Sequence, residues 1–578
     1  MNNNNKKMRY VGAPCGSGKT YAVCKSIGEA AKTGTLNNTL IISPSKDLIG
    51  QTKEQLTTFG VDPIVITSDT TKNVSAYAVE LFKDTDTQGQ VVLMTHAGFQ
   101  RTPVFLNKQY WHLYVDEIPS VDTFHDPIIP YNHQLLTDYL DIIPLNGTVN
   151  EVTIKDGMEP SVNMFLRQSN DEIYNIVKPI LRDLIEGRMV YTDTKAYGKI
   201  VEKQEISKDT PADAAYGNAK NRLYFLSMLT PAIFEGWDET TILGANFENS
   251  MLAKYWNEYH QIIFLPSEEI YSRLRYERHD IGERLSIRYI QDDTWSKYQR
   301  DMEPHTDCNF QSYGNAIDDY VENVVFKDSR YVYVANTDYE NTNLKNAERM
   351  PVISHGLNAY QDHTNVYYSP AINRQPKHMQ MLDAIGFDNT FVQRATSHEI
   401  VYQAIMRCAL RNPNDDSAVN VVVPDKASCT SLARLFPGCS IGGIDNNKLK
   451  RTKPPSKSVG ERKRNCQFNK LLEGMKLTKR VRFSYIDEEC TDFINLDMTP
   501  NNATNTSNQN KIVISFFPNI HTTHGTTENI TDLVGFRRDL KKLFTTNVYG
   551  DGFNISGTSG KKDNFLCSPA AFDPSKSD

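Results

Sequence analysis

The sequence predicts an α/β protein with two successive parallel sheets flanked by helices, and three observations predict this class. Short apolar runs alternate with amphipathic helical segments through the first 430 residues, which is the pattern of strands joined by crossover helices. The runs are nearly continuous rather than alternating, as expected for strands buried on both faces. The alternation extends through two blocks, and the 578 residues suffice for roughly three to four domains of ~150 residues each.

The first block, residues 1–265, contains most of the expected strands. They are residues 8–12, 38–45, 63–69, 90–96, 111–117, 240–250 and 260–266. Residues 120–220 interrupt this pattern with polar and amphipathic segments, including a helical pattern around Asn170–Glu186. We interpret them as an insertion carried on the first domain.

A second α/β block is expected over residues 266–430, with strands at residues 329–337, 350–355, 365–371 and 417–425. Beyond it, residues 431–510 are expected to form a basic extension and linker. Residues 448–464 are basic and contain prolines, and residues 501–510 form a polar, asparagine-rich hinge. A smaller C-terminal module over residues 511–578 gives the chain an α+β extension.

Composition and charge exclude several classes of protein. No apolar run approaches the ~20 residues that would span a bilayer, and the N-terminus lacks the apolar core of a secretory signal. We therefore expect a cytoplasmic protein with no membrane partner. The nine cysteines include no C-x-x-C pair, which indicates neither a zinc site nor a disulfide framework. A net charge of −7 argues against a general polyanion binder and leaves room for a local basic groove.

The segment after the first expected strand fits a phosphate-binding loop. It reads Ala13-Pro14-Cys15-Gly16-Ser17-Gly18-Lys19-Thr20 and matches G-x-x-x-x-G-K-S/T, with alanine at the first glycine position. Gly16 and Gly18 let the backbone curl so that its N–H groups face phosphate oxygens at a helix N-terminus. Lys19 would reach the β- and γ-phosphates, and the Thr20 hydroxyl would bind Mg²⁺. The loop predicts ATP and Mg²⁺ as cofactors; the alternative is a glycine-rich turn with a chance lysine.

An acidic pair follows the buried run at residues 111–117. Asp116 is placed to bind Mg²⁺ through water, and Glu117 to polarise the attacking water. The alternative is a surface acidic pair. A single acidic residue would suit a nucleotide switch, whereas the pair favours hydrolysis.

Three polar side chains in the second block, Gln403, Arg407 and Arg411, are spaced four residues apart. This spacing predicts that they share one face of a helix. Two arginines on that face could clamp the γ-phosphate and stabilise the charge that develops as it leaves. The alternative is a solvated basic face.

Together these motifs resemble those of superfamily 2 helicases over roughly residues 8–430. In chain order, the segments that carry the resemblance are 13–20 (motif I), 41–52 (motif Ia), 95–101, 116–119 (a DEAD-like motif II), 242–256 (motif III), 354–366 (motif V) and 403–411 (motif VI). Gly244-Ala245-Asn246 replaces the Ser-Ala-Thr of motif III, and motif VI has one residue more than usual between its arginines. The resemblance implies two tandem RecA-like domains with ATP hydrolysed between them. It places Gly356 and Asn358 at the domain interface and leaves open which arginine is the finger.

The resemblance also implies a nucleic-acid strand across the strand ends, bound mostly through its phosphates. The candidate contacts are Ser43, Pro44, Ser45 and Lys46 after one strand and Thr95, His96 and Arg101 after another. His355 and Tyr360 are candidates on the second domain, and the basic linker at residues 448–464 is a further one. The asparagine-rich, divergent sequence is similar to helicases of phages and large viruses. It favours DNA over RNA, a role in genome replication or recombination and, if viral, the host cytoplasm; the C-terminal tail is a candidate docking segment for replication proteins.

Two other functions remain open from the sequence. A motor-nuclease, such as a viral DNA-packaging ATPase, would share both ATPase motifs and add a two-metal carboxylate cluster. Asp487, Glu488, Glu489 and Asp492 are candidates for such a cluster. A nucleotide-gated adaptor is the non-catalytic alternative, but it would gain nothing from a water-polarising carboxylate at Glu117.

Overall fold

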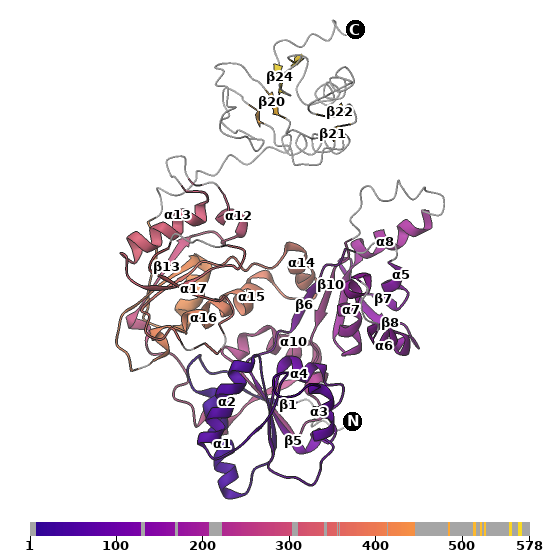
Figure 1. Cartoon of the computed structure of the whole chain (residues 1–578), viewed down its shortest axis with the longest axis vertical. Helices are drawn as coiled ribbons and strands as arrows, with labels where there is room; N and C mark the ends of the chain where they lie inside the picture. The colour runs from indigo at the N-terminus through magenta and orange to yellow at the C-terminus, as the bar shows by residue number, and fades with distance from the viewer. Residues whose placement is uncertain are drawn as a thin grey trace. The chain divides into compact units, whose positions relative to one another are not determined.

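The computed structural model divides the chain into two compact units, Met1–Arg451 and Thr452–Asp578 (Figure 1). The structure describes residues 7–128, 133–167, 172–206, 222–302, 304, 310–339, 344–354, 356–357, 359–412 and 414–445 of the first unit. Of the second unit it describes six short strands. Within the first unit we distinguish a first lobe (residues 7–121 and 229–271), an insertion (residues 122–228) and a second lobe (residues 285–445).

The first lobe is built on a seven-stranded parallel sheet with the order β12-β1-β11-β5-β2-β4-β3. Its strands are β1 (Lys7–Val11), β2 (Asn38–Ser43), β3 (Ile64–Ile66), β4 (Val91–Thr95), β5 (Trp111–Asp116), β11 (Glu239–Leu243) and β12 (Ile263–Pro266). Its helices are α1 (Lys19–Thr33), α2 (Lys46–Thr58), α3 (Val74–Leu81), α4 (His96–Arg101), α10 (Met251–His260) and α11 (Glu268–Tyr271).

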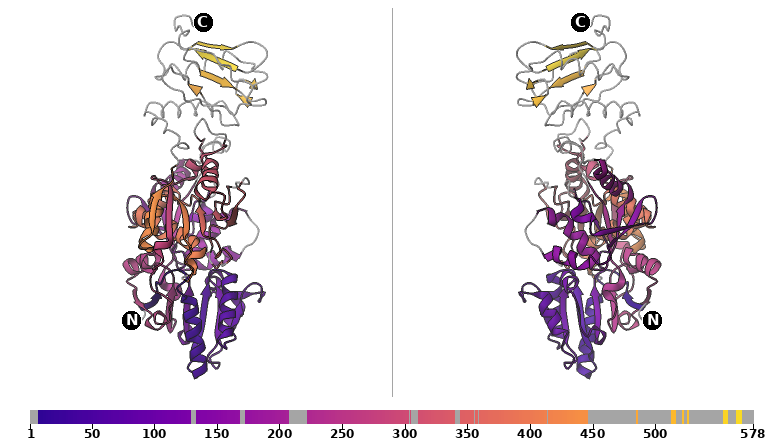
Figure 2. Two further views of the ribbon diagram at one scale, coloured as in Figure 1. Left: turned by 90° about the vertical axis from the view of Figure 1, so that its left-hand side faces the viewer. Right: turned by 90° about the vertical axis from the view of Figure 1, so that its right-hand side faces the viewer.

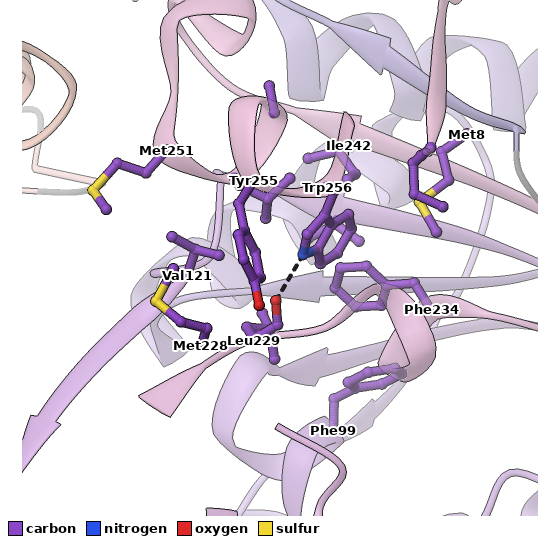
Figure 3. Packing of buried hydrophobic residues seen from close by; sticks show 14 of the residues in the cluster. Met8, Phe99, Val121, Met228, Leu229, Phe234, Ile242, Met251, Tyr255 and Trp256 are labelled. Carbon is purple, nitrogen blue, oxygen red and sulfur yellow. Dashed lines mark hydrogen bonds between the residues drawn. The ribbon is translucent and has the colours of Figure 1, made fainter. Parts of the chain in front are cut away.

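Helices cover both faces of this sheet, which explains the continuous apolar runs of its strands. Helices α1 and α2 lie on one face, and α3 and α4 on the other (Figures 1 and 2). Successive strand residues point to opposite faces, so Ile41 packs in the core under α1 and α2 while Leu40 and Ile42 pack in the core of the opposite face. That second core includes Trp256 of α10, whose Nε1 donates to the carbonyl oxygen of Leu229 at 2.7 Å (Figure 3).

The insertion forms a five-stranded antiparallel sheet with the order β6-β10-β9-β8-β7. Its strands are β6 (Asp122–His125), β7 (Leu140–Pro144), β8 (Val149–Ile154), β9 (Met189–Asp193) and β10 (Phe225–Met228), and its helices are α5 (Gln134–Thr137), α6 (Glu159–Arg167), α7 (Glu172–Ile185) and α8 (Thr194–Ile206). It has its own hydrophobic core, to which Phe165, Ile180 and Phe225 contribute.

The second lobe contains a six-stranded parallel sheet with the order β15-β14-β16-β17-β13-β18. Its strands are β13 (Leu285–Gln291), β14 (Tyr331–Val334), β15 (Ala347–Met350), β16 (Asn365–Tyr368), β17 (Val419–Asp425) and β18 (Ser440–Gly443). Its helices are α12 (Lys297–Arg300), α13 (Tyr313–Tyr320), α14 (Pro376–Ala384), α15 (Asn389–Gln393), α16 (Glu399–Ile405) and α17 (Lys426–Leu435). The two parallel sheets flanked by helices confirm the predicted fold class.

The second unit contains a four-stranded antiparallel sheet and a two-stranded one. The strands are β19 (Ser484–Tyr485), β20 (Ile512–Ser515), β21 (His521–Thr522), β22 (Gly525–Thr526), β23 (Asn554–Gly557) and β24 (Asn564–Ser568). The basic linker, the asparagine-rich hinge and the acidic candidates Asp487, Glu488, Glu489 and Asp492 lie outside the described residues. No helix in the described part of the chain is long and apolar enough to cross a membrane.

Candidate active site

The phosphate-binding loop connects β1 to α1 and needs its glycines. Gly16 and Gly18 have φ angles of +81° and +87°, in the left-handed region that favours glycine. A Cβ on Gly16 would lie 2.6 Å from the hydroxyl oxygen of Tyr276. Because α1 begins at Lys19, its first N–H groups have no partner within the helix and face outward as an anion site.

Lys19 sits inside the curl of this loop. Its Nζ donates to the carbonyl oxygens of Ala13 at 2.8 Å and Pro14 at 3.1 Å. These two contacts hold the ammonium at the loop and leave its third hydrogen for a phosphate oxygen. Ala13 and Ser17 are buried, and among the described residues the Ser17 hydroxyl has no hydrogen-bond partner.

Thr20 and Asp116 form the pair that would hold Mg²⁺. The Thr20 hydroxyl donates to Asp116 Oδ1 at 3.0 Å. Burial and, next, the charge of Glu117 raise the pKa of Asp116 to about 7. A buried carboxyl with a raised pKa is a site where a divalent cation would favour the ionised form. The hydroxyl and the carboxylate therefore fit Mg²⁺, although the described residues include no group of three or more His, Cys, Asp or Glu that could hold a metal by themselves.

Glu117 follows β5 directly and has a φ of +63°. This left-handed conformation is unfavourable for a non-glycine residue. It turns the chain out of the sheet at the edge where the strands end, so that Glu117 borders two cavities.

The first cavity, of about 360 Å³, lies between the two lobes and collects most of the predicted active-site residues. The predicted residues that line it are Cys15, Gly16, Gly18, Lys19, Thr20, Asp116, Glu117, Gly356, Gln403, Arg407 and Arg411. Its size is in the range of small-molecule sites. Ala13, Pro14 and Ser17 form the rest of the loop, and Asn358 lies outside the described residues.

The expectation of one continuous helix through Gln403, Arg407 and Arg411 is wrong. Helix α16 ends at Ile405, and Arg411 belongs to a separate 3₁₀ turn, Ala409–Arg411. Contacts from elsewhere in the fold replace the helical hydrogen bonds: the Ala409 N–H donates to the His363 carbonyl oxygen at 3.0 Å, and Arg284 Nη2 donates to the Ala409 carbonyl oxygen at 2.6 Å. The two arginines nevertheless reach the same cavity.

Arg407 is the more deeply buried arginine, at 4% exposure. Burial and the nearby charge of Arg411 lower its pKa. Its Nη1 is 3.5 Å from the Leu357 carbonyl oxygen, and its Nε has no partner among the described residues. A buried guanidinium in this setting favours an anion such as the γ-phosphate.

Sequence reasoning missed a third arginine in this cavity, Arg275. Its backbone N–H donates to the Ser17 carbonyl oxygen at 2.9 Å, and its guanidinium lies 5.8 Å from the ring centre of Tyr21. Both residues line the cavity. Arg275 belongs to the polar segment between β12 and β13, and nothing in its local pattern marks it as a site residue.

Hydrogen bonds across the cleft join the two lobes. The Cys15 N–H donates to the Tyr402 hydroxyl oxygen at 2.8 Å, and Gln51 Nε2 donates to the Gly356 carbonyl oxygen at 2.8 Å. At the end of β11, the Asn246 side chain donates to Glu399 of α16 at 2.7 Å.

Glu399 also forms a hydrogen bond with Gln403, which lines the cavity. Gln403 donates to its other carboxylate oxygen at 3.0 Å. Burial raises the pKa of Glu399 to about 7, although the amides of Asn246 and Gln403 oppose the shift. Asn246 of the altered motif III is therefore linked, through Glu399, to a residue that lines the cavity.

Two of the predicted nucleic-acid contacts, Pro44 and His96, line a second cavity of about 570 Å³. Glu117 and Gln403 line both this cavity and the first one. The Ser45 and Thr95 hydroxyls accept from the N–H groups of Leu48 and Gly98 and so cap α2 and α4.

The other predicted contacts lie away from this cavity. Lys46 pairs with Asp69 at 2.5 Å, Ser43 is buried, and Arg101 ends α4. Tyr360 donates to the Arg349 carbonyl oxygen, and His355 lies outside the described residues.

Comparison with known proteins adds a family match at the N-terminus. Residues 1–119 match the family "Type III restriction enzyme, res subunit", which confirms the resemblance to superfamily 2 helicases over the part of the chain that holds the phosphate loop and the acidic pair. No curated protein matches the chain. Similar solved structures include a variant of S. cerevisiae Dbp5 bound to RNA and ADP BeF3, at 10% identity, with 77% of this chain and 87% of that chain covered and a TM-score of 0.31. Another is Mss116p bound to ssRNA and AMP-PNP, at 9% identity, with 81% and 77% covered and a TM-score of 0.31.

Proposed function

We propose that this chain, a superfamily 2 helicase-like NTP hydrolase, hydrolyses ATP between its two lobes and uses the cycle to move along a nucleic-acid strand. One observation carries the proposal. The phosphate loop and the acidic pair of the first lobe line the same cavity as Arg407 and Arg411 of the second.

Different residues of the cavity have different roles in the proposed reaction. The N–H groups at the start of α1 and the Lys19 ammonium bind the β- and γ-phosphates. Thr20 and Asp116 would hold Mg²⁺, which neutralises phosphate charge when bound. Glu117 orients the attacking water and accepts its proton.

We assign Arg407 as the residue that stabilises the transferring phosphoryl group. It is buried, and no ion pair with a carboxylate is found for it among the described residues. The Arg407 guanidinium would interact most strongly with the triphosphate in the transition state, when negative charge develops on the phosphate oxygens. Arg411 would then support binding of the nucleotide and contact between the lobes.

The second cavity supports a path for the strand. It is lined by Pro44 and His96 of the first lobe and by the exposed Arg394 and Arg434 of the second. Arginines bind backbone phosphates without reading the sequence. Because Glu117 and Gln403 border this cavity too, a strand held there could alter the hydrolysis site. We propose DNA as the substrate, in viral genome replication or recombination, on the virus-like character of the sequence.

Lys19→Ala tests the proposal directly. We expect this variant to fold and to lose ATP hydrolysis stimulated by nucleic acid, as measured by phosphate release with single strands, duplexes and RNA. A wild-type protein that hydrolyses ATP no faster with any of them would contradict movement along a strand. Strand displacement on DNA and RNA with opposite overhangs identifies the substrate and the polarity.

A further inference from the structure

The conformation of Glu117 raises the question of what holds it. A φ of +63° costs a non-glycine residue ~1–2 kcal/mol, and such conformations persist only where the surroundings impose them. On the preceding side, β5 holds the chain: Asp116 lies in register with Leu243 of β11 and accepts from Thr20. The strand thus fixes Asp116, and residues after Glu117 must fix the other side.

The next residues pack against the end of β11 and are hydrogen-bonded to the chain leaving β10. Ile118 lies so close to Gly244 that a Cβ on Gly244 would be 2.2 Å from Ile118 Cγ1. The Val121 carbonyl oxygen accepts from the Leu229 N–H at 2.6 Å. Asp122 follows at once and begins β6 of the insertion.

Asp122 is a buried anion compensated from the second lobe. Its side chain is 2% exposed, and both of its oxygens accept from Arg374, one from Nη2 at 3.0 Å and the other from Nη1. His378 Nε2 lies 2.8 Å from the same carboxylate. Burial alone would raise the pKa of Asp122, but His378 and the charge of Arg374 lower it below its usual value. Phe124 stacks on His378 with ring centres 4.6 Å apart.

These partners lie at α14, a second-lobe helix that packs away from its own sheet. Met381 and Leu382 of α14 belong to the same core as Leu226 of the insertion and Trp256 of α10. Figure 1 shows α14 beside β6 and β10. The chain reaches α14 from β16 and leaves it toward α16, the helix of Gln403. Displacement of β16 and α16 therefore acts on α14 from both of its ends.

We propose that Asp122 is a positioning residue for hydrolysis. Asp122 is held by Arg374 and His378 and fixes the loop after Glu117, so the placement of the Glu117 carboxylate depends on α14. The inference rests on the role proposed for Glu117. Only four residues separate Glu117 from Asp122, and each spans at most ~3.6 Å. Because this stretch is short, we expect a shift of Asp122 to displace Glu117.

Asp122→Asn tests this dependence because it removes the charge and keeps the shape. We expect kcat for ATP hydrolysis to fall about 10- to 100-fold, as for a small misplacement of a catalytic group. The KM for ATP and the Kd of Mg-ADP should stay within about threefold, since the phosphate loop is not touched. Arg374→Lys keeps a charge but loses the two-pronged contact, and should lower kcat in the same direction by a smaller factor.

Asp193→Asn is the matched control. Asp193 ends β9 of the insertion, is buried, and pairs with Lys377 of α14 at 2.7 Å, but it is remote in sequence from Glu117. We expect its kcat to stay within about threefold of the wild type. An equal loss in Asp193→Asn would show that the ion pairs merely brace α14, and would overturn the proposal.

Two further outcomes would also overturn it. One is an Asp122→Asn protein with wild-type kcat. The other is an Asp122→Asn loss confined to the KM for ATP. Glu117→Gln separates the two proposals: if it is inactive while Asp122→Asn is fully active, only the positioning role fails, whereas an active Glu117→Gln enzyme refutes the hydrolytic role on which it rests.

Discussion

Arg407→Gln should separate a catalytic arginine from a structural one, because the structure predicts opposite effects on activity and stability. Arg407 is 4% exposed, and burial, followed by the charge of Arg411, lowers its pKa. Its side-chain contact is a 3.5 Å approach of Nη1 to the Leu357 carbonyl oxygen. The folded protein without nucleotide therefore carries a desolvated charge at a cost in stability.

Loss of an arginine that stabilises phosphoryl transfer lowers kcat by about 10³- to 10⁵-fold, which corresponds to about 4–7 kcal/mol in the activation barrier. Removal of the buried charge should leave the melting temperature of the nucleotide-free protein unchanged or raise it. Phosphate release at saturating ATP measures the first effect, and thermal unfolding measures the second.

Arg411→Gln is the companion variant. Arg411 is only partly buried, so we expect a smaller loss of kcat together with weaker ATP binding. If Arg407→Gln lowered the melting temperature by several degrees while kcat stayed within tenfold, Arg407 would be structural. A larger loss of kcat in Arg411→Gln would reverse the assignment of the two arginines.

The remaining predictions concern the Asp116 carboxyl, the phosphate-binding loop and the core of the second lobe. Burial and then Glu117 raise the pKa of Asp116 to about 7, so this carboxyl holds more proton in the folded protein than in the unfolded chain between about pH 4 and 7. It therefore lowers the unfolding free energy as pH rises through that window. Asp116→Asn should lose less stability than the wild type between pH 5 and pH 8, as measured by urea titrations without Mg²⁺, and an equal loss would contradict the shift. Gly16→Ala should abolish binding of a fluorescent nucleotide, since φ is +81° and the new Cβ would meet the Tyr276 hydroxyl; retained affinity would contradict the geometry. Tyr367→Phe should lower the unfolding free energy by about 1–2 kcal/mol, because its hydroxyl donates at 2.9 Å to the fully buried Asp318, and chemical denaturation should detect the loss.

Strands with two buried faces, such as β2, β4 and β5, were revealed by their apolar runs. The edge strand β12 was also predicted, although it is largely exposed. Ile41 and its neighbours in β2 are apolar on both sides because helices cover both faces of the sheet. β13 was not predicted, although it pairs with both β17 and β18. It reads Leu285-Ser286-Ile287-Arg288 at its start, and Arg288 is exposed beside the edge strand β18. A half-exposed strand of this kind lacks the apolar run on which the prediction depended.

The helix break before Arg407 could not be predicted from spacing. Residues 399–411 contain neither Gly nor Pro, so local propensity favours a continuous helix. The break comes from tertiary partners: Arg284 and the His363 carbonyl take the backbone groups of Ala409. Sequence reasoning found the motif side chains that reach the cavity, because the chemistry requires those residue types. It missed Arg275 and the backbone path after Ile405, because contacts with remote parts of the chain place them.

The arrangement of contacts across the cleft suggests how nucleotide binding and lobe movement are connected. Cys15 of the phosphate loop, Gln51 of α2 and Asn246 after β11 each donate to the second lobe at 2.7–2.8 Å. Since both lobes line the first cavity, separating them must break these bonds and expose their polar groups to water. The net cost is modest, about 0.5–1.5 kcal/mol for each hydrogen bond. A triphosphate that bridges Lys19 and Arg407 would add charge-assisted contacts to the same closed state and favour it further. Hydrolysis and release of phosphate would remove that bridge, and with it the added stabilisation of the closed cleft.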